Sequence, residues 1–536
     1  MHKLLNKKCE SEEETNIKSK WLFKEPTQED YVKIIKNMKD SKAEGIDRFS
    51  VNNFKNSLLN TANLLTKITK AIIDKESWPS KMKTQIIRPI FKKGKKNDIS
   101  NYRPIAILPV LNKFVEKYFA EKLMEFLQNN DIITKNQFGF QKGKGTTEAL
   151  KSLNEKIASA LNEGKFVGAI FVDLQKAFDT INRRKIIEKL KKLGLDTKFC
   201  NILCSYLTER KCCVRIGKEV SSELEINDGV PQGSVLGPLL FLVYINDIDD
   251  IADLNPTLFA DDILSLIIAE TRSQLNQEID RNLNNIHKWC TSNEVYISEE
   301  KTKVMIFRDK TVNEGNFFIH KESCRELSCR TDCTEIKKVN YIKYLGLTLD
   351  SQWNFSQHID NLNKKLRQML PKMYLLKKIL SHKNKLIIYE SWIKSHISYA
   401  LEIYGSAGKK GLNQLQKLQN KIVKILFCNC RRRSIDQVYN HTKILKVKQL
   451  YEYMHIVKHF FEWKAIYNEK VKSKPYQTKS TKFIPLLTKN KYGEKLADFV
   501  LPNIFSKLPT EIWLCNTYKD LKLKVKNWLS TDACKA

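Results

Sequence analysis

The sequence lacks a long apolar run, a regular cysteine framework and a balance between acidic and basic residues. Its most apolar run, Pro238 to Ile245, is far too short to span a bilayer. Residues 1–20 are polar and mixed in charge, so we expect no signal peptide, and neither end has a lipidation signal. The 13 cysteines, an odd number without regular spacing, favour a reducing compartment. We therefore expect an intracellular protein without membrane attachment, in the nucleus, the cytoplasm or both.

Acidic residues are scarce relative to basic ones. The chain has 60 Asp and Glu against 93 Lys and Arg, a net charge of +33. An excess of this size, spread over the chain, indicates a polyanionic partner, most simply nucleic acid. Apolar residues make up 42% of the sequence, which is ordinary for a folded protein and excludes a wholly disordered one. At 536 residues the chain has room for more than one domain.

What the sequence does contain is an adjacent pair of aspartates, Asp261 and Asp262, between two apolar runs. The runs, Pro256 to Ala260 and Ile263 to Ala269, predict two short buried strands with the chain reversing at or next to the pair. Two adjacent anions at a hairpin tip are costly unless a cation is present. Aspartate is also a common turn former, so the pair alone is equally compatible with simple turn chemistry.

A third carboxylate, Asp173, ends the apolar run Val167 to Val172, which is typical of a buried central strand. A predicted helix from Leu174 to Leu193 follows, so Asp173 is alternatively a helix N-cap. If its strand neighbours the Asp-Asp hairpin, three carboxylates converge and bind hard divalent cations, Mg²⁺ being the physiological choice. Two such ions activate a 3′-hydroxyl group and hold a leaving pyrophosphate.

Two further segments suit a nucleotide. Strand-like Ile86 to Phe91 and Asn101 to Ile107 flank a lysine-rich turn, which predicts a basic hairpin able to hold phosphates, although a lysine run is also common at a solvated turn. Arg103 within the returning strand favours an anion. Gln232 lies between Pro231 and Gly233 in a loop that glycine and proline restrict, where the backbone can be approached closely. In a chain of this charge, these parts predict a template-directed polymerase.

Six motifs stand in a defined order along the chain: Asn101-Tyr-Arg-Pro-Ile, Gln137-Phe-Gly-Phe, Asp173-Leu-Gln-Lys-Ala-Phe-Asp, Gly229-Val-Pro-Gln-Gly-Ser-Val-Leu-Gly-Pro, Phe259-Ala-Asp-Asp and Tyr344-Leu-Gly. In this order they resemble the reverse transcriptases of non-LTR (LINE-type, jockey-like) retrotransposons. The resemblance is strongest from about Lys81 to Asp350. It implies an α+β fold, the right-hand polymerase with fingers, an antiparallel-sheet palm and a helical thumb, and extra helical regions at both ends.

The resemblance also implies a division of the chain and roles for single residues. We expect an N-terminal helical extension (1–71), a reverse transcriptase domain of fingers and palm (72–350), a helical thumb (351–430) and a basic helical C-terminal region (431–536). The residues implied in catalysis and substrate binding are the metal ligands Asp173, Asp261 and Asp262, the candidate general acid Lys301, the steric gate Phe178, the triphosphate-binding Lys92, Lys93 and Arg103, and Gln232 with Gly233 beside the nascent base pair.

The implied function is that of an RNA-directed DNA polymerase, a nucleotidyltransferase. It would extend a DNA primer on an RNA template with dNTPs, using Mg²⁺, with Mn²⁺ as a possible substitute. We expect endonuclease activity to be absent from this chain or supplied in trans, because the stretch before the fingers is too short for that domain. The alternative is a catalytically inactive remnant that binds nucleic acid, which the joint presence of the expected site residues disfavours. The cluster His320, Cys324, Cys329 and Cys333 fits no zinc spacing and stays outside the predicted site.

Overall fold

A computed structural model describes residues 25–41, 44–309, 316–320, 333–428, 434–472 and 483–531. The chain has an α+β fold and divides into two compact units. Unit 1 comprises residues 1–142, 172–264 and 282–302, and unit 2 comprises 143–171, 265–281 and 303–536. The boundary between the units falls within two strands, β3 (Phe166–Asp173) and β8 (Asp262–Ala269).

Unit 1 begins with helices that bury an apolar stripe. They are α1 (Gln28–Asn37), α2 (Val51–Lys55), α3 (Leu58–Lys75) and α4 (Val110–Asn129). Helix α1 starts at a capping box in which Thr27 and Asp30 bond each other's backbone N–H groups, satisfying donors that a helix end leaves free. The apolar stripe of α1, including Tyr31 and Ile34, is buried. The helix therefore packs through one apolar face.

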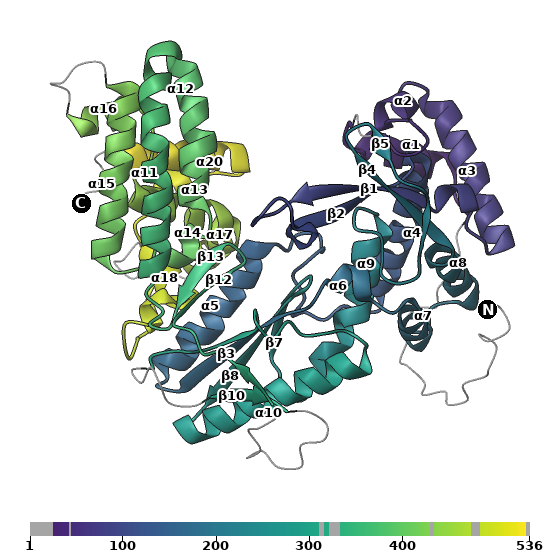
Figure 1. Cartoon of the computed structure of the whole chain (residues 1–536). Helices are drawn as coiled ribbons and strands as arrows, with labels where there is room; N and C mark the ends of the chain where they lie inside the picture. Colours follow the sequence, from purple (N-terminus) through teal and green to yellow (C-terminus); the bar gives the residue numbers. More distant parts are fainter. Residues whose placement is uncertain are drawn as a thin grey trace. The chain divides into compact units, whose positions relative to one another are not determined.

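A five-stranded sheet follows in unit 1 (Figure 1). Strands β1 (Thr84–Phe91) and β2 (Tyr102–Ile107) pair antiparallel, which confirms the predicted hairpin. Strand β4 (Arg210–Ile216) pairs parallel with β1 and antiparallel with the short strands β5 (Glu219–Val220) and β6 (Leu224–Ile226). The sequence did not predict β4, because a parallel partner more than a hundred residues away leaves no local signal.

The second sheet has the strand order β7-β8-β3-β9, with β7 at Pro256–Phe259 and β9 at Lys303–Ile306. The predicted central strand is confirmed, because residues 167–172 are all buried and β3 lies between two neighbours. Helix α10 (Arg272–Ser292) lies along this sheet (Figure 1). Gly168 allows this close approach, since a Cβ atom there would come within 2.9 Å of Ile279 Cδ1 on the helix.

The predicted helix from Leu174 to Leu193 is wrong as a single element. The structure has two helices, α6 (Ala177–Thr180) and α7 (Arg183–Lys192), separated by an extended residue, Ile181. The break arises because the side chain of Asn182 accepts hydrogen bonds from the N–H groups of Arg184 and Lys185 and starts a new helix. The later helices of unit 1 are α8 (Thr197–Leu207) and α9 (Leu236–Ile245).

Unit 2 is mainly helical beyond its share of the second sheet. It contains α5 (Thr146–Asn162) and two hairpins, β10–β11 (Phe317–Ile319, Thr334–Ile336) and β12–β13 (Tyr341–Tyr344, Leu347–Asp350). The helices that follow are α11 (Ser356–Ile379), α12 (His382–Ile388), α13 (Ser395–Ser398), α14 (Leu401–Tyr404), α15 (Lys409–Phe427), α16 (Ile435–Thr442), α17 (Val447–Lys472), α18 (Ala497–Phe505), α19 (Thr510–Trp513) and α20 (Tyr518–Ser530). Within the described residues, no helix combines the length and apolarity that crossing a membrane would require.

Candidate active site

Asp173 stands at the end of β3, as predicted, in unit 1. Its backbone N–H donates to Thr302 Oγ1 at 3.3 Å, and its carbonyl oxygen accepts a 2.7 Å bond from the N–H of Ser298. Its carboxylate lies 3.0 Å from the ammonium nitrogen of Lys301. The backbone is thus held by the segment just before β9, and the half-exposed side chain meets the lysine predicted as general acid.

Asp261 lies in the turn between β7 and β8, and Asp262 is the first residue of β8. This confirms the predicted hairpin. Ala260 has a φ of 55°, the left-handed conformation that closes the turn. Since β8 is the sheet neighbour of β3, the hairpin tip and Asp173 come from adjacent strands. The structure thereby brings together the elements of all three predicted metal ligands.

The Gln137-Phe-Gly motif supports this turn, a role that the sequence did not suggest. Gln137 is 1% exposed, and its side-chain oxygen accepts hydrogen bonds from the N–H groups of Gly139 (2.7 Å) and Ala260 (3.3 Å). Phe138 N–H donates to Leu258 O at 2.8 Å, so the motif runs beside β7. A Cβ atom at Gly139 would collide with Ala260 N, so glycine is required for this approach.

The electrostatics of the three carboxylates favour a cation. Although Asp262 lies at the surface, desolvation by surrounding protein atoms, and then the charges of Asp261 and Asp173, raise its pKa from 3.8 to about 6. Like charges in one place disfavour ionisation in this way. The side-chain oxygens of the three residues do not all lie within 4.8 Å of one another. Carboxylate oxygens are nevertheless the donor set that suits a hard divalent ion.

Gln232 is held by unit 1 on two sides. Its carbonyl oxygen accepts a 2.8 Å bond from Ala106 N–H of β2, and its side-chain amide donates to Asp179 Oδ1 at 2.9 Å. Gly233 has a φ of 124°, and a Cβ atom there would collide with Ala106 O. The predicted rigid loop is therefore anchored to the basic hairpin and to the segment after β3. Burial raises the pKa of Asp179, and the Gln232 bond opposes that rise.

Phe178 lies in α6 and is half-buried. Its ring stacks on Phe241 of α9 with a centroid distance of 4.6 Å and makes an edge contact with Phe140 at 6.3 Å. Two aromatic neighbours restrict the ring to few orientations, which a steric gate needs. Whether Phe178 has that role stays a prediction.

Lys92, Lys93 and Arg103 are all exposed in the β1–β2 hairpin. Lys92 N–H donates to Asn101 O at 2.8 Å, which closes the base of the lysine-rich turn, and Arg103 pairs opposite Ile90. Arg103 and Ala106, the anchor of Gln232, belong to the same strand, β2. The hairpin is thus joined to the Gly-rich loop, whereas contact between these three cations and a triphosphate stays a prediction.

Glu116 is a buried carboxylate that was not among the residues predicted from the sequence. It is 0% exposed and accepts hydrogen bonds from Asn112 Nδ2 (2.5 Å), Tyr206 OH (2.8 Å) and the N–H group of Val235 (2.5 Å). Val235 immediately precedes α9, so Glu116 anchors the end of the loop that carries Gln232. The available signal was the position of Glu116 on the same helical face as the buried Phe119.

Two other predicted features lie in unit 2. The Tyr344-Leu-Gly motif is the tight turn of the β12–β13 hairpin, with positive φ at Leu345 and Gly346, and Leu345 O accepts a hydrogen bond from Tyr399 OH. His320 Nδ1 lies 3.1 Å from Cys333 Sγ, while Cys324 and Cys329 lie outside the described residues.

Comparison with known proteins agrees with this geometry. Residues 92–349 match the family described as reverse transcriptase (RNA-dependent DNA polymerase). Among similar Drosophila melanogaster proteins, the probable RNA-directed DNA polymerase from transposon BS is 28% identical over 74% of this chain and 44% of its own length. The RNA-directed DNA polymerase from mobile element jockey is 30% identical over 67% of this chain and 39% of its own length.

The fold and these matches define the class: residues 92–349 belong to the reverse transcriptase family. Within that class, the relatives of this chain are polymerases of non-LTR retrotransposons, including the jockey, BS and X elements, which confirms the resemblance drawn from the six motifs. The chain spans less than half the length of each of these relatives.

Proposed function

We propose that this chain is an RNA-directed DNA polymerase of a non-LTR retrotransposon, extending a DNA primer on an RNA template with dNTPs. The observation that carries the proposal is the placement of Asp173 at the end of β3 beside the β7–β8 hairpin, whose tip holds Asp261 and Asp262. The names of the relatives support the same activity.

Asp173, Asp261 and Asp262 would hold Mg²⁺, or Mn²⁺ in its place. The donor set is all oxygen, and the raised pKa of Asp262 reflects a surplus of negative charge that a cation relieves. Two bound ions would supply activation of the primer 3′-hydroxyl and neutralisation of the leaving pyrophosphate. The three carboxylates thus fit the role as ligands, and the chain positions them through β3, β7 and β8.

Lys301 would donate a proton to the departing pyrophosphate. Its ammonium group is held at Asp173 and its side chain is 64% exposed, so it can turn from the carboxylate toward a phosphate. Asp173 thus keeps the ammonium group beside the carboxylates until the lysine turns toward the phosphate.

The incoming nucleotide would lie between the basic hairpin and the carboxylates. Lys92, Lys93 and Arg103 would hold its triphosphate, because exposed ammonium and guanidinium groups bind phosphate oxygens. The ring of Phe178 would exclude a ribose 2′-hydroxyl group, and the loop at Gln232 and Gly233 would contact the nascent base pair.

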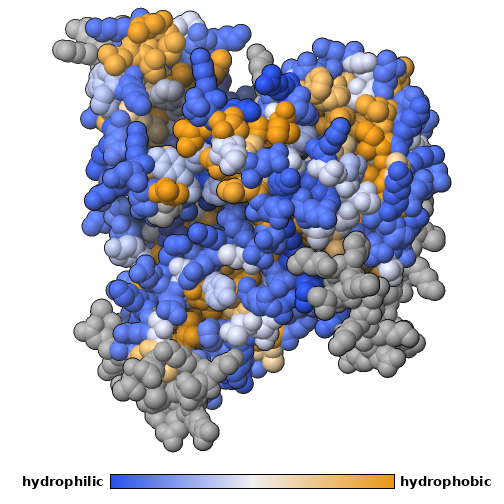
Figure 2. All heavy atoms as spheres, turned by 45° about the vertical axis from the view of Figure 1, so that its right-hand side comes forward, coloured by the Kyte–Doolittle hydropathy of each residue, from blue (hydrophilic) through white to orange (hydrophobic). Residues whose placement is uncertain are grey.

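The net charge of +33 suits a template–primer duplex, and the face of the molecule in Figure 2 is mainly hydrophilic with separate apolar patches. The right-hand arrangement belongs to the same proposal, with fingers and palm before Asp350, the helices α11 to α15 as thumb and the helices from α16 onward as the C-terminal region.

Primer extension on a homopolymer RNA template tests the proposal. We expect wild-type protein with Mg²⁺ or Mn²⁺ to extend the primer, and Asp261→Ala to fail. No extension by the wild type with either ion would refute polymerase activity and leave a protein that only binds nucleic acid. Equal extension by wild type and Asp261→Ala would refute the metal assignment instead.

A further inference from the structure

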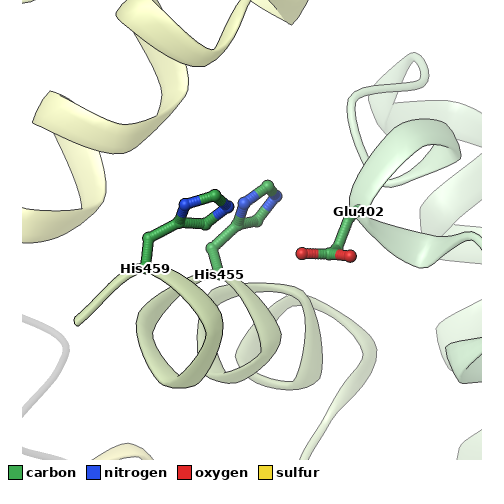
Figure 3. A group of neighbouring side chains, drawn as sticks. All are labelled: Glu402, His455 and His459. Atoms are coloured by element: carbon green, nitrogen blue, oxygen red, sulfur yellow. The ribbon is translucent and has the colours of Figure 1, made fainter. Parts of the chain in front are cut away.

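A second group of potential metal ligands lies wholly in unit 2. It consists of Glu402 on α14 and two residues of α17, His455 and His459. One ligand atom from each lies within 4.8 Å of the others. Figure 3 shows both imidazole rings rising from one helix, with the carboxylate of Glu402 reaching the same space from another segment. Histidines four apart on a helix share one face, so this spacing places both rings together.

His455 is the most telling member of the group. It is 6% exposed, and within the described part of the chain neither of its ring nitrogens has a hydrogen-bond partner at ordinary distance and angle, although the ring interacts weakly with the backbone of Glu402. A buried polar atom without a partner costs about 1–3 kcal/mol. Buried nitrogens of this kind call for an explanation, and an unplaced ion is one of the usual ones.

His459 is already oriented for a ligand role. Its Nδ1 atom lies 3.5 Å from Glu462 Oε2, which leaves Nε2 directed at the cluster. A carboxylate on the outer nitrogen of a metal-binding histidine selects the tautomer and holds the ring in place.

A cation already occupies part of this space. Lys151 Nζ lies 2.9 Å from Glu402 Oε1 and 3.3 Å from His459 Nε2, between two of the three ligands. The other nearby ammonium, Lys458, is 2.7 Å from Glu148 Oε1 and 3.8 Å from Glu402 Oε2, so it has a carboxylate of its own. Lys151 is therefore the charge that a metal ion would have to displace.

We propose that Glu402, His455 and His459 form a Zn²⁺ site that ties α14 to α17, with Lys151 as the competing cation. Two imidazole nitrogens and one carboxylate oxygen are a ligand set that zinc accepts, with the fourth position open. The proposal does not depend on polymerase activity.

Metal analysis of the full chain tests this site. Apoprotein would be equilibrated with buffered Zn²⁺ in excess Mg²⁺, and bound zinc measured by mass spectrometry for wild type, His455→Asn, His459→Asn and the control His396→Asn. We expect wild type and the control to hold one zinc ion more than either cluster variant. Because cysteines also bind zinc, Co²⁺ absorption identifies the ligands: the bands that the cluster variants lose should lack thiolate character.

Lys151→Met sharpens the test, since it removes the competitor without removing a ligand. We expect its zinc affinity to rise about tenfold, because no ammonium–carboxylate bond has to be broken. Circular dichroism confirms that each variant is folded. Equal zinc content in wild type and both histidine variants would overturn the site, and unchanged or weaker binding by Lys151→Met would overturn the competing role of that lysine.

Discussion

The aspartates of unit 1 and the Glu402 cluster of unit 2 show opposite electrostatics. In unit 1, desolvation and neighbouring carboxylates raise the pKa of Asp262 to about 6. In unit 2, burial also pushes the pKa of Glu402 upward, but Lys151 and Lys458 outweigh that effect and leave the pKa below 4.5. The unit 1 aspartates therefore carry a surplus of negative charge, whereas the charge of Glu402 is balanced by Lys151 and Lys458 of the same unit.

The largest expected effect is loss of primer extension in Asp261→Ala. Removal of one preorganised charged group from the reacting centre lowers turnover by at least about 10²–10³-fold. The matched control is Glu188→Gln, an exposed carboxylate on α7 of the same unit, which should retain wild-type activity. A comparable loss of primer extension in both variants would contradict a specific role of Asp261 in the active site.

Phe178 tests whether the unit 1 site faces a nucleotide. Phe178→Ala removes the ring that stacks on Phe241 and that we propose excludes a ribose 2′-hydroxyl group. We therefore expect incorporation of ribonucleotides relative to deoxynucleotides to rise by roughly 10- to 100-fold. Competition between dNTPs and rNTPs in primer extension measures this ratio. The gate assignment fails if activity persists with unchanged selectivity.

Glu402→Gln tests how much the ion pair between Glu402 and Lys151 contributes to stability. Its side chain is 3% exposed, so the substitution leaves Lys151 without its carboxylate partner in a largely buried position. We expect a loss of about 2–3 kcal/mol of stability, seen as a lower thermal midpoint. Asp436→Asn, which removes an exposed pair with Lys446 in the same unit, should cost no more than about 0.5 kcal/mol. Similar midpoints for the two variants would contradict the importance of the buried pair.

Asp262→Asn should increase the stability of the protein, whereas Glu402→Gln decreases it. Because the folded-state pKa of Asp262 lies above its unfolded value, wild-type stability falls as pH rises from about 4 to about 6 and stays reduced above that. The variant should therefore be more stable than wild type at pH 7.5, by about 1 kcal/mol after allowance for solvent screening, and nearly equal at pH 4. Thermal melts at both pH values measure the difference.

Mg²⁺ provides the check on that prediction. The ion should raise the melting midpoint of wild-type protein at pH 7.5 more than that of Asp262→Asn, because binding to the native state stabilises it. An equal shift in both proteins would mean that Asp262 does not contribute to the cation site.

Much of the unit 1 site could be predicted from sequence, because its signals are local. An apolar run that ends in Asp173 and two runs that flank Asp261 and Asp262 indicate strands with carboxylates at their ends, and the structure has those strands. Helices α11 and α15 lie within residues 351–430, which were expected to be helical. The roles assigned to the basic hairpin, Phe178 and Lys301 rest on resemblance and stay predictions.

Contacts between distant segments could not be predicted from the sequence. Gln137 appeared in a motif, yet its bond to Ala260 depends on a fold that brings residues 123 positions apart into contact. The bond between Asp179 and Gln232 and the burial of Glu116 have the same origin. His455 and His459 are four residues apart in the C-terminal region that was expected to be helical, but nothing in the sequence pointed to Glu402 as their neighbour.

The sequence by itself determined many of the strands and helices, the basic charge of the chain and the reverse transcriptase motifs, because periodicity and ordered motifs are properties of neighbouring residues. Only the tertiary structure decided how charged groups meet. Packing placed the Asp261–Asp262 hairpin beside Asp173, whose carboxylate pairs with Lys301, and it placed Lys151 against Glu402. The electrostatic energy of a carboxylate depends on the distance and burial of its neighbours, and folding alone decides both.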